Sequence, residues 1–236
     1  DGADRGKAMA ELSTTSTDNA LDRWFFTFMA GLLALVAVVG FLPNSMAILH
    51  GTMVNPQFLV HVHAALMFGW VGLFVVQASM IATHRRPTHV YLGGAGSLLA
   101  LAIILSMTYL AITRFPTESP FPFHSLVLFQ ARRIVLFAAF VALALLLRKK
   151  DGDTHKRLLL LATMVPLDAA WNRLDFLHSF GMEGRAIPVR IHEFIVFAPL
   201  IAFDLYKLGT VHKATAIGGL LFFGSAALTI VSVGWR

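Results

Sequence analysis

Seven long apolar stretches follow one another along the chain, and each is about long enough to cross a lipid bilayer. A membrane-spanning helix needs about 20 mostly apolar residues. Short connections rich in Pro, Gly and Asn separate the stretches, and none of them has room for a second domain. The alternation of polar and apolar residues that marks a membrane β-barrel is absent from the sequence. The stretches cover approximately residues 23–43, 57–83, 90–113, 123–147, 156–177, 190–208 and 213–235.

The composition is that of a chain that folds in lipid. Of its 236 residues, 57% are apolar and 14% are charged, and the mean hydropathy is +0.71. Soluble domains are about 45–50% apolar and about 25% charged. The absence of cysteine excludes a disulfide framework, thiolate metal ligands and thiol catalysis. We therefore expect an all-α polytopic membrane bundle of seven transmembrane helices in one domain, residues 23–236, after a disordered polar tail, residues 1–22.

The basic residues predict how this bundle is oriented. Twelve of the 19 Lys and Arg residues lie on one side of the predicted membrane, four lie on the other side, and three lie within the spans. Because positively charged loops stay in the cytoplasm, we expect the N-terminus inside and the C-terminus outside. The net charge of +6 then reflects topology and contact with anionic lipid, and no nucleic-acid partner is expected.

Charged residues near the middle of the fourth and fifth stretches predict a buried ion pair. At about 1.5 Å per residue, Arg132 and Arg133 lie roughly 14 Å from one membrane surface and Asp168 lies roughly 16 Å from the other. These depths are similar, so we expect Arg132 or Arg133 to pair with Asp168 inside the bundle. The pair either locks the helices in register or takes part in function.

Histidines gather at the predicted outer ends of several stretches. Imidazole binds zinc, copper, iron and haem iron, so the histidines predict a metal, haem or quinone site, or alternatively a structural layer of hydrogen bonds. Helical residues two apart point about 200° away from each other, so one of His61 and His63 faces elsewhere unless the helix begins between them. The histidines predicted at the cytoplasmic side, such as His89 and His155, are expected to be solvated or to face lipid headgroups. The predicted ligands are His61, His63, His124 and His192, with Asn172, Asp175 and Glu193 as groups that orient them.

A longer pattern begins at His61 and His63, continues through Trp70 to Gln77, and enters a basic loop that contains His84 and His89. The pattern resembles a family of uncharacterised bacterial seven-helix membrane proteins. The resemblance covers most of residues 57–215 and implies the bacterial inner membrane and the seven-helix fold, but it carries no established activity. A more distant likeness, through histidines in helices, is to membrane b-type cytochromes, and it implies haem b.

Three classes of function are consistent with these predictions. The first is electron transfer through haem b or a transition metal ion (Cu, Fe or Zn), with quinone or a periplasmic protein as partner. The second is a metal-dependent hydrolase of membrane lipids, in which a zinc-bound water is the nucleophile. The third is a proton-coupled transporter or a non-catalytic accessory subunit of a membrane complex, because carriers of protons need charges inside the bundle.

Overall fold

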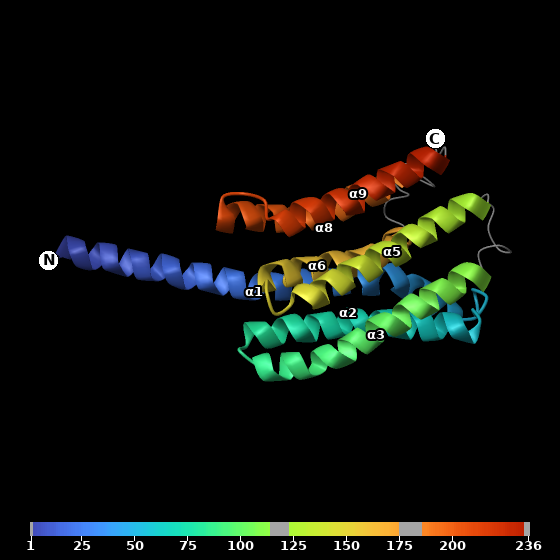
Figure 1. Cartoon of the computed structure of the whole chain (residues 1–236). Helices are drawn as coiled ribbons and strands as arrows, with labels where there is room; N and C mark the ends of the chain where they lie inside the picture. The colour runs from blue at the N-terminus through green and yellow to red at the C-terminus, as the bar shows by residue number, and fades with distance from the viewer. Residues whose placement is uncertain (1, 114–122, 175–185, 234–236) are drawn as a thin grey trace.

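The computed structural model describes the backbone of residues 2–113, 123–174 and 186–233, and all regular structure in these ranges is helical. Long apolar runs explain this, because a backbone in lipid must satisfy its hydrogen bonds internally. The elements lie close to the predicted stretches (Figure 1). They are α1 (Gly2–Leu49), α2 (Phe58–Ala82), α3 (Arg86–Thr113), α5 (Phe123–Leu147), α6 (Gly152–Met164), the 3-10 helix η1 (Val165–Leu167), α7 (Asp168–Trp171), α8 (Ala186–Leu208) and α9 (Lys213–Val233).

Five of these helices are long and apolar enough to cross a membrane, as judged by length and composition among the described residues. They correspond to predicted stretches one, two, three, four and seven. Their large apolar side chains are widely exposed on the surface of the bundle, as lipid-facing residues are. The five segments are Ala20–Leu49, Phe58–Ala82, Arg86–Thr113, Leu128–Leu147 and Lys213–Ser232.

The fifth and sixth predicted stretches differ from the other five. The fifth is broken at η1, where Pro166 lacks a backbone N–H and the chain tightens into a 3-10 turn before α7. The sixth, α8, carries four charged residues: Arg190, Glu193, Asp204 and Lys207. Residues 157–165 of α6 and η1 are almost all buried, and α6 packs against α5, α9 and α1. The broken segment is therefore the core of the bundle, and apolar helices shield its polar groups from lipid.

Helix α1 extends beyond the predicted stretch in both directions. It begins at Gly2, so the backbone of the expected disordered tail continues the helix, and Figure 1 shows this part projecting away from the other helices. Ala, Met, Glu and Leu residues between positions 3 and 12 have high helix propensity and favour this continuation locally. At its other end the helix runs through Pro43 to Leu49.

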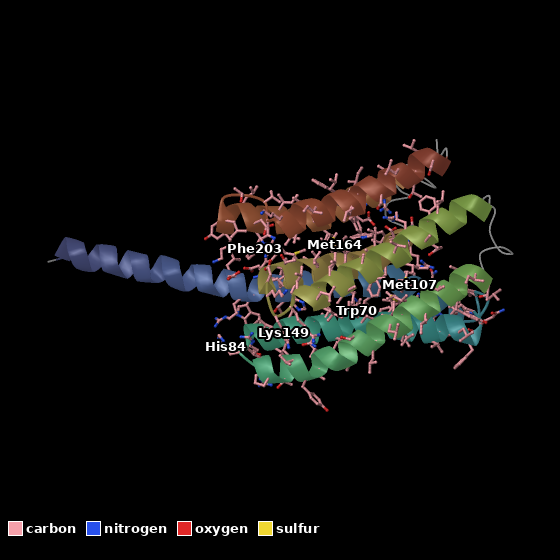
Figure 2. All side chains as sticks on the ribbon, viewed as in Figure 1. Trp70, His84, Met107, Lys149, Met164 and Phe203 are labelled. Carbon is pink, nitrogen blue, oxygen red and sulfur yellow. The ribbon has the colours of Figure 1, made fainter. Side chains whose placement is uncertain are left out.

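The connections between helices lie at two ends of the bundle. Figure 1 shows the α2–α3, α5–α6 and α8–α9 connections at one end, and the α1–α2 connection at the other. We call the first of these the basic end, because it carries Arg85, Arg86, Arg148, Lys149 and Lys150. Figure 2 shows His84 and Lys149 at this end. Trp70, farther along the bundle, donates a hydrogen bond to Thr163 of the core segment at 3.1 Å.

Candidate functional site

A fully buried carboxylate, Asp168, lies at the centre of the most highly charged region of the bundle. It is the first residue of α7, directly after the 3-10 turn η1, which contains Pro166. Arg132 Nη2 and Arg133 Nε of α5 donate to Asp168 Oδ2 at 2.9 and 3.0 Å. The sequence predicts one of these two arginines as the partner of Asp168, and in the structure both contact it. Arg190 Nη2 of α8 donates to the other oxygen, Oδ1, at 2.5 Å.

Glu193 adds a second buried carboxyl group to the same region. It is fully buried, one helical turn after Arg190 on α8, and its Oε2 lies 2.5 Å from Arg190 Nη1. It also interacts with the Asp168 carboxyl. Neither Glu193 oxygen has a well-oriented hydrogen bond among the described residues. The sequence predicts Glu193 as a group that orients a histidine, whereas the structure places it among arginines.

These five side chains, Arg132, Arg133, Asp168, Arg190 and Glu193, form what we call the arginine–carboxylate cluster. Three guanidinium groups face two carboxyl groups, so the cluster keeps an excess of positive charge even when both acids are ionised. Two of its N–H donors, Arg132 Nε and Arg190 Nε, are buried without a hydrogen-bond partner among the described residues. Buried donors almost always have an acceptor, so these donors are suited to the oxygens of an anion.

A second buried ion pair lies closer to the basic end. Arg157 Nε and Nη2 of α6 donate to Asp204 Oδ1 of α8 at 2.9 and 2.5 Å, and both side chains are buried. Arg157 precedes Asp168 by 11 residues, and Glu193 precedes Asp204 by the same interval. Eleven residues make about three turns, or roughly 16 Å, and return to the same helix face. The segment α6–α7 and the antiparallel helix α8 therefore contact each other through charged side chains at two levels of the bundle.

Apolar side chains occupy the space between these two levels. Gly218 and Gly219 of α9 lie there, and a side chain on either would collide with its neighbours. A Cβ on Gly218 would meet Leu161 of α6, and one on Gly219 would lie 2.7 Å from the ring of Phe197 of α8. The two glycines let α9 pack closely on both helices, so an apolar layer separates the arginine–carboxylate cluster from the pair at the basic end.

Three of the four predicted histidine ligands, His61, His63 and His192, have described side chains, and these three lie on separate parts of the bundle. His61 is exposed and contacts Asn55 Oδ1 at 2.8 Å, whereas His63 contacts Ser106 Oγ of α3 at 2.9 Å. The two therefore face different neighbours, as their spacing predicts. The ring of His192 on α8 lies 5.5 Å from that of Trp171. Helix α2 packs mainly on α1 and α3, and α8 packs on α7 and α9, so the chain folds these histidines onto separate parts of the bundle.

The remaining predicted site residues are placed as follows. Asn172 donates to the backbone oxygen of Asp168 at 2.9 Å, which makes it part of the α7 turn. The side chain of His124 and the whole of Asp175 lie outside the described residues. Among the described residues, no group of three or more His, Asp or Glu side chains is arranged to hold a metal ion.

Arg190 is the member of the arginine–carboxylate cluster that sequence reasoning misses. Depth alone places it at the membrane surface, where an arginine needs no partner. The matching 11-residue intervals on α6–α7 and α8 are the signal that could have found its neighbours. No protein-family model, curated protein or solved structure matches the chain. Function is therefore inferred from the geometry of the described residues.

Proposed function

We propose that the protein is a proton-coupled carrier of a small anion in the bacterial inner membrane. In this proposal the chain crosses the bilayer seven times, with its N-terminus in the cytoplasm and its C-terminus outside. The alternating connections of the bundle support seven passes, and the charge of the basic end supports this orientation. The observation that carries the function is the excess of guanidinium groups over carboxyl groups in the arginine–carboxylate cluster, whose carboxyl groups and Arg132 are buried and whose other two arginines are partly buried.

Arg190 provides the coupling in this proposal, because it contacts both carboxyl groups of the cluster. When Glu193 is protonated it is neutral, and it no longer competes with an external anion for the guanidinium group. The anion then binds to the N–H donors of Arg190 and Arg132. When Glu193 loses its proton, its carboxylate returns to Arg190 and displaces the anion. Anion and proton therefore bind together and leave together, which is symport.

The second level of charge supplies the closure that a carrier needs. Arg157 and Asp204 are buried to 2% and 0% exposure, whereas the Arg133 and Arg190 side chains keep 17% and 20%. The apolar layer around Gly218 and Gly219 lies between the two levels. The described conformation is therefore closed toward the basic end, as expected for one of two alternating states.

Transport into sealed vesicles tests this function. Purified protein is reconstituted into liposomes that contain a pH-sensitive dye, and sodium succinate, phosphate or chloride is added outside. We expect one of these anions to acidify the interior, and Glu193→Gln to reduce the rate to that of protein-free liposomes. Arg85→Gln, which changes an exposed loop arginine, is the matched control. If no anion acidifies the interior, or if Glu193→Gln behaves like the unmodified chain, the proposal is wrong.

A second candidate function is electron transfer with quinone or a periplasmic protein. The position of His192 favours it, because its ring lies beside Trp171 and its neighbours in sequence, Arg190 and Glu193, belong to the cluster. Arginines of the cluster fit the acidic groups of haem b, and imidazole fits haem iron or another transition metal ion. An absorption spectrum of the purified protein, oxidised and then reduced, tests this candidate. A preparation grown with haem precursor that lacks a Soret band contradicts the haem version.

A further inference from the structure

Two histidine rings lie close together at the basic end, one on α3 and the other on α6. Their ring centres lie 6.5 Å apart, and the ring planes are at 87°. Both His89 and His155 are partly buried, whereas the sequence predicts side chains that are solvated or face lipid headgroups. They are not members of the arginine–carboxylate cluster, and the proposed transport does not use them.

Backbone carbonyls fix which ring nitrogen of each histidine carries the proton. His89 Nδ1 donates to the carbonyl oxygen of Gln77 at 3.3 Å, and His155 Nδ1 donates to that of Ala144 at 2.8 Å. Because a carbonyl oxygen only accepts, each Nδ1 is protonated, and in the neutral imidazole each Nε2 therefore keeps a lone pair. Metal-binding histidines commonly have this arrangement, in which a backbone oxygen orients the ring and the other nitrogen binds the metal.

Gln77 adds a third acceptor at the same level of the bundle. Its backbone oxygen orients His89, and its side-chain Oε1 is buried without a hydrogen-bond donor among the described residues. Gln77 follows Trp70 by seven residues on α2, and His155 precedes Thr163, the partner of Trp70, by eight residues on α6. Equal rise along two antiparallel helices brings Gln77 and His155 to the same depth. Hydrogen-bond acceptors that lie near one another without a donor, here the two Nε2 atoms and Gln77 Oε1, are suited to binding a cation.

The ring separation and the surrounding charge select the kind of cation. With nitrogen–metal distances of about 2 Å, two imidazoles on a tetrahedral ion hold their centres roughly 5 Å apart, and on a linear ion roughly 6 Å apart. The observed 6.5 Å is closer to the linear arrangement. Arg86 and Arg148 interact with the pair, and their positive charge opposes a divalent ion more strongly than a monovalent one. Copper is a metal that imidazole binds well.

We propose that Nε2 of His89 and Nε2 of His155 bind one Cu(I) ion at the basic end of the bundle. The site links α3 and α6 and lies beside α2, whose Gln77 backbone oxygen orients His89. It is distinct from the histidine site predicted at the opposite end, since it shares no residue with it. It also stands independently of the proposed anion transport.

Competition with a coloured chelator tests the site. Detergent-purified full-length protein is titrated with Cu(I) under anaerobic conditions in the presence of bicinchoninate, and X-ray absorption then reports the ligands. We expect one Cu(I) per chain with two nitrogen ligands at close to 2 Å, roughly the nitrogen–metal distance of imidazole ligands. The same stoichiometry is expected in Glu193→Gln, which is designed to abolish transport, so failure of the two proposals is distinguishable. Stoichiometric Zn(II) binding without Cu(I) binding would overturn the assignment.

Substitutions locate the ion. His89→Gln and His155→Gln are each expected to lose the bound Cu(I), whereas His155→Met, which supplies a soft thioether, is expected to keep it. The matched control is His84→Asn at the same end, because His84 has a φ of 60° and Asn tolerates that left-handed conformation. Helical circular dichroism and elution volume in detergent show whether each variant is folded. Unchanged Cu(I) binding in folded His89→Gln or His155→Gln, or no binding by the unmodified chain, would overturn the proposal.

Discussion

Arg157 and Asp204 show how a buried ion pair is stabilised in the core of an apolar bundle. The pair is buried, and the polar atoms that do not join the two side chains have other partners. Asp204 Oδ2 accepts a hydrogen bond from the backbone N–H of His212 at 3.1 Å, and Arg157 Nη1 donates one to the backbone oxygen of Asp153 at 3.0 Å. Phe26 and Phe203 lie about the guanidinium group, with ring centres 5.9 and 6.0 Å from its central carbon. Breaking a buried pair costs more than replacing it, because the survivor is left uncompensated.

Mutation of this pair is expected to be strongly non-additive. Arg157→Met alone leaves the Asp204 carboxylate buried without its partner. Asp204→Leu alone leaves the Arg157 guanidinium group buried without its partner. Each single substitution should lower the free energy of unfolding by about 3–5 kcal/mol. The double variant should lose much less free energy of unfolding than the two single variants lose together. Thermal denaturation in detergent of the unmodified protein, the two single variants and the double variant measures these losses. Additive losses would contradict the role assigned to the pair.

Asp151 gives a prediction about pH at the start of α6. Its side chain accepts from the Thr154 hydroxyl and from the Thr154 backbone N–H at 2.6 and 2.8 Å, and these hydrogen bonds hold its pKa below the usual value. A depressed pKa in the folded state stabilises the protein above the unfolded pKa of about 3.9, and this stability is lost as the pH falls through the folded value.

Substitution of Asp151 separates the capping role from the charge. Asp151→Ala should cost about 1 kcal/mol at neutral pH, as the loss of an N-cap does. Asp151→Asn keeps the accepting oxygen but does not titrate, so it should retain most of the stability at neutral pH and show a smaller loss between about pH 5 and about pH 3. Melting temperatures measured across this range report both effects. Equal pH profiles for Asn and Asp at this position would contradict the prediction.

At the scale of the helices, α1 contains a contact that depends on the absence of a side chain. A Cβ on Gly40 would lie 2.6 Å from the backbone oxygen and 2.8 Å from the Cα of Ala170 in α7. Backbone atoms cannot move aside as a flexible side chain can. Gly31 lies on the same helix, and a Cβ added there would have nothing within 4 Å, so it provides a matched comparison.

The same substitution at these two glycines should have opposite effects. Gly40→Ala should lower stability by about 1–3 kcal/mol through overpacking, and it should shift the α7 turn that carries Asp168. Gly31→Ala should be neutral or slightly stabilising, because Ala has the higher helix propensity. Denaturation in detergent compares the two. If Gly40→Ala is as stable as Gly31→Ala, α1 and α7 do not pack as described.

The elements also show what the sequence can and cannot predict. Runs of about 20 apolar residues locate the helices, and equal depth brings Arg132 and Arg133 to Asp168. Depth and periodicity do not reveal the order of helices around the bundle. For that reason the sequence pattern groups His61 and His63 with His192, although α2 and α8 pack against different neighbours. The same limit hides the pairing of His89 with His155.

For the whole molecule, the uneven charge of its two ends predicts which way it faces. Arg85, Arg86, Arg148, Lys149 and Lys150 lie at the basic end, and Arg23 of α1 contacts His84 there at 3.2 Å. The connection between α1 and α2, residues 50–57, contains no basic residue other than His50. Retention of positive loops in the cytoplasm predicts that the basic end faces inward. The chain has no cysteine, so a single introduced cysteine can report the position of any loop.

Labelling of single cysteines in intact cells tests this orientation. Thr52→Cys lies in the exposed α1–α2 connection and should react with a membrane-impermeant maleimide added outside. Lys149→Cys and Thr210→Cys lie in exposed connections at the basic end and should react only after the membrane is permeabilised. These three positions follow α1, α5 and α8, so together they report whether successive passes alternate. The reverse labelling would invert the predicted orientation, and would then require the anion and proton to enter the cluster from the cytoplasm.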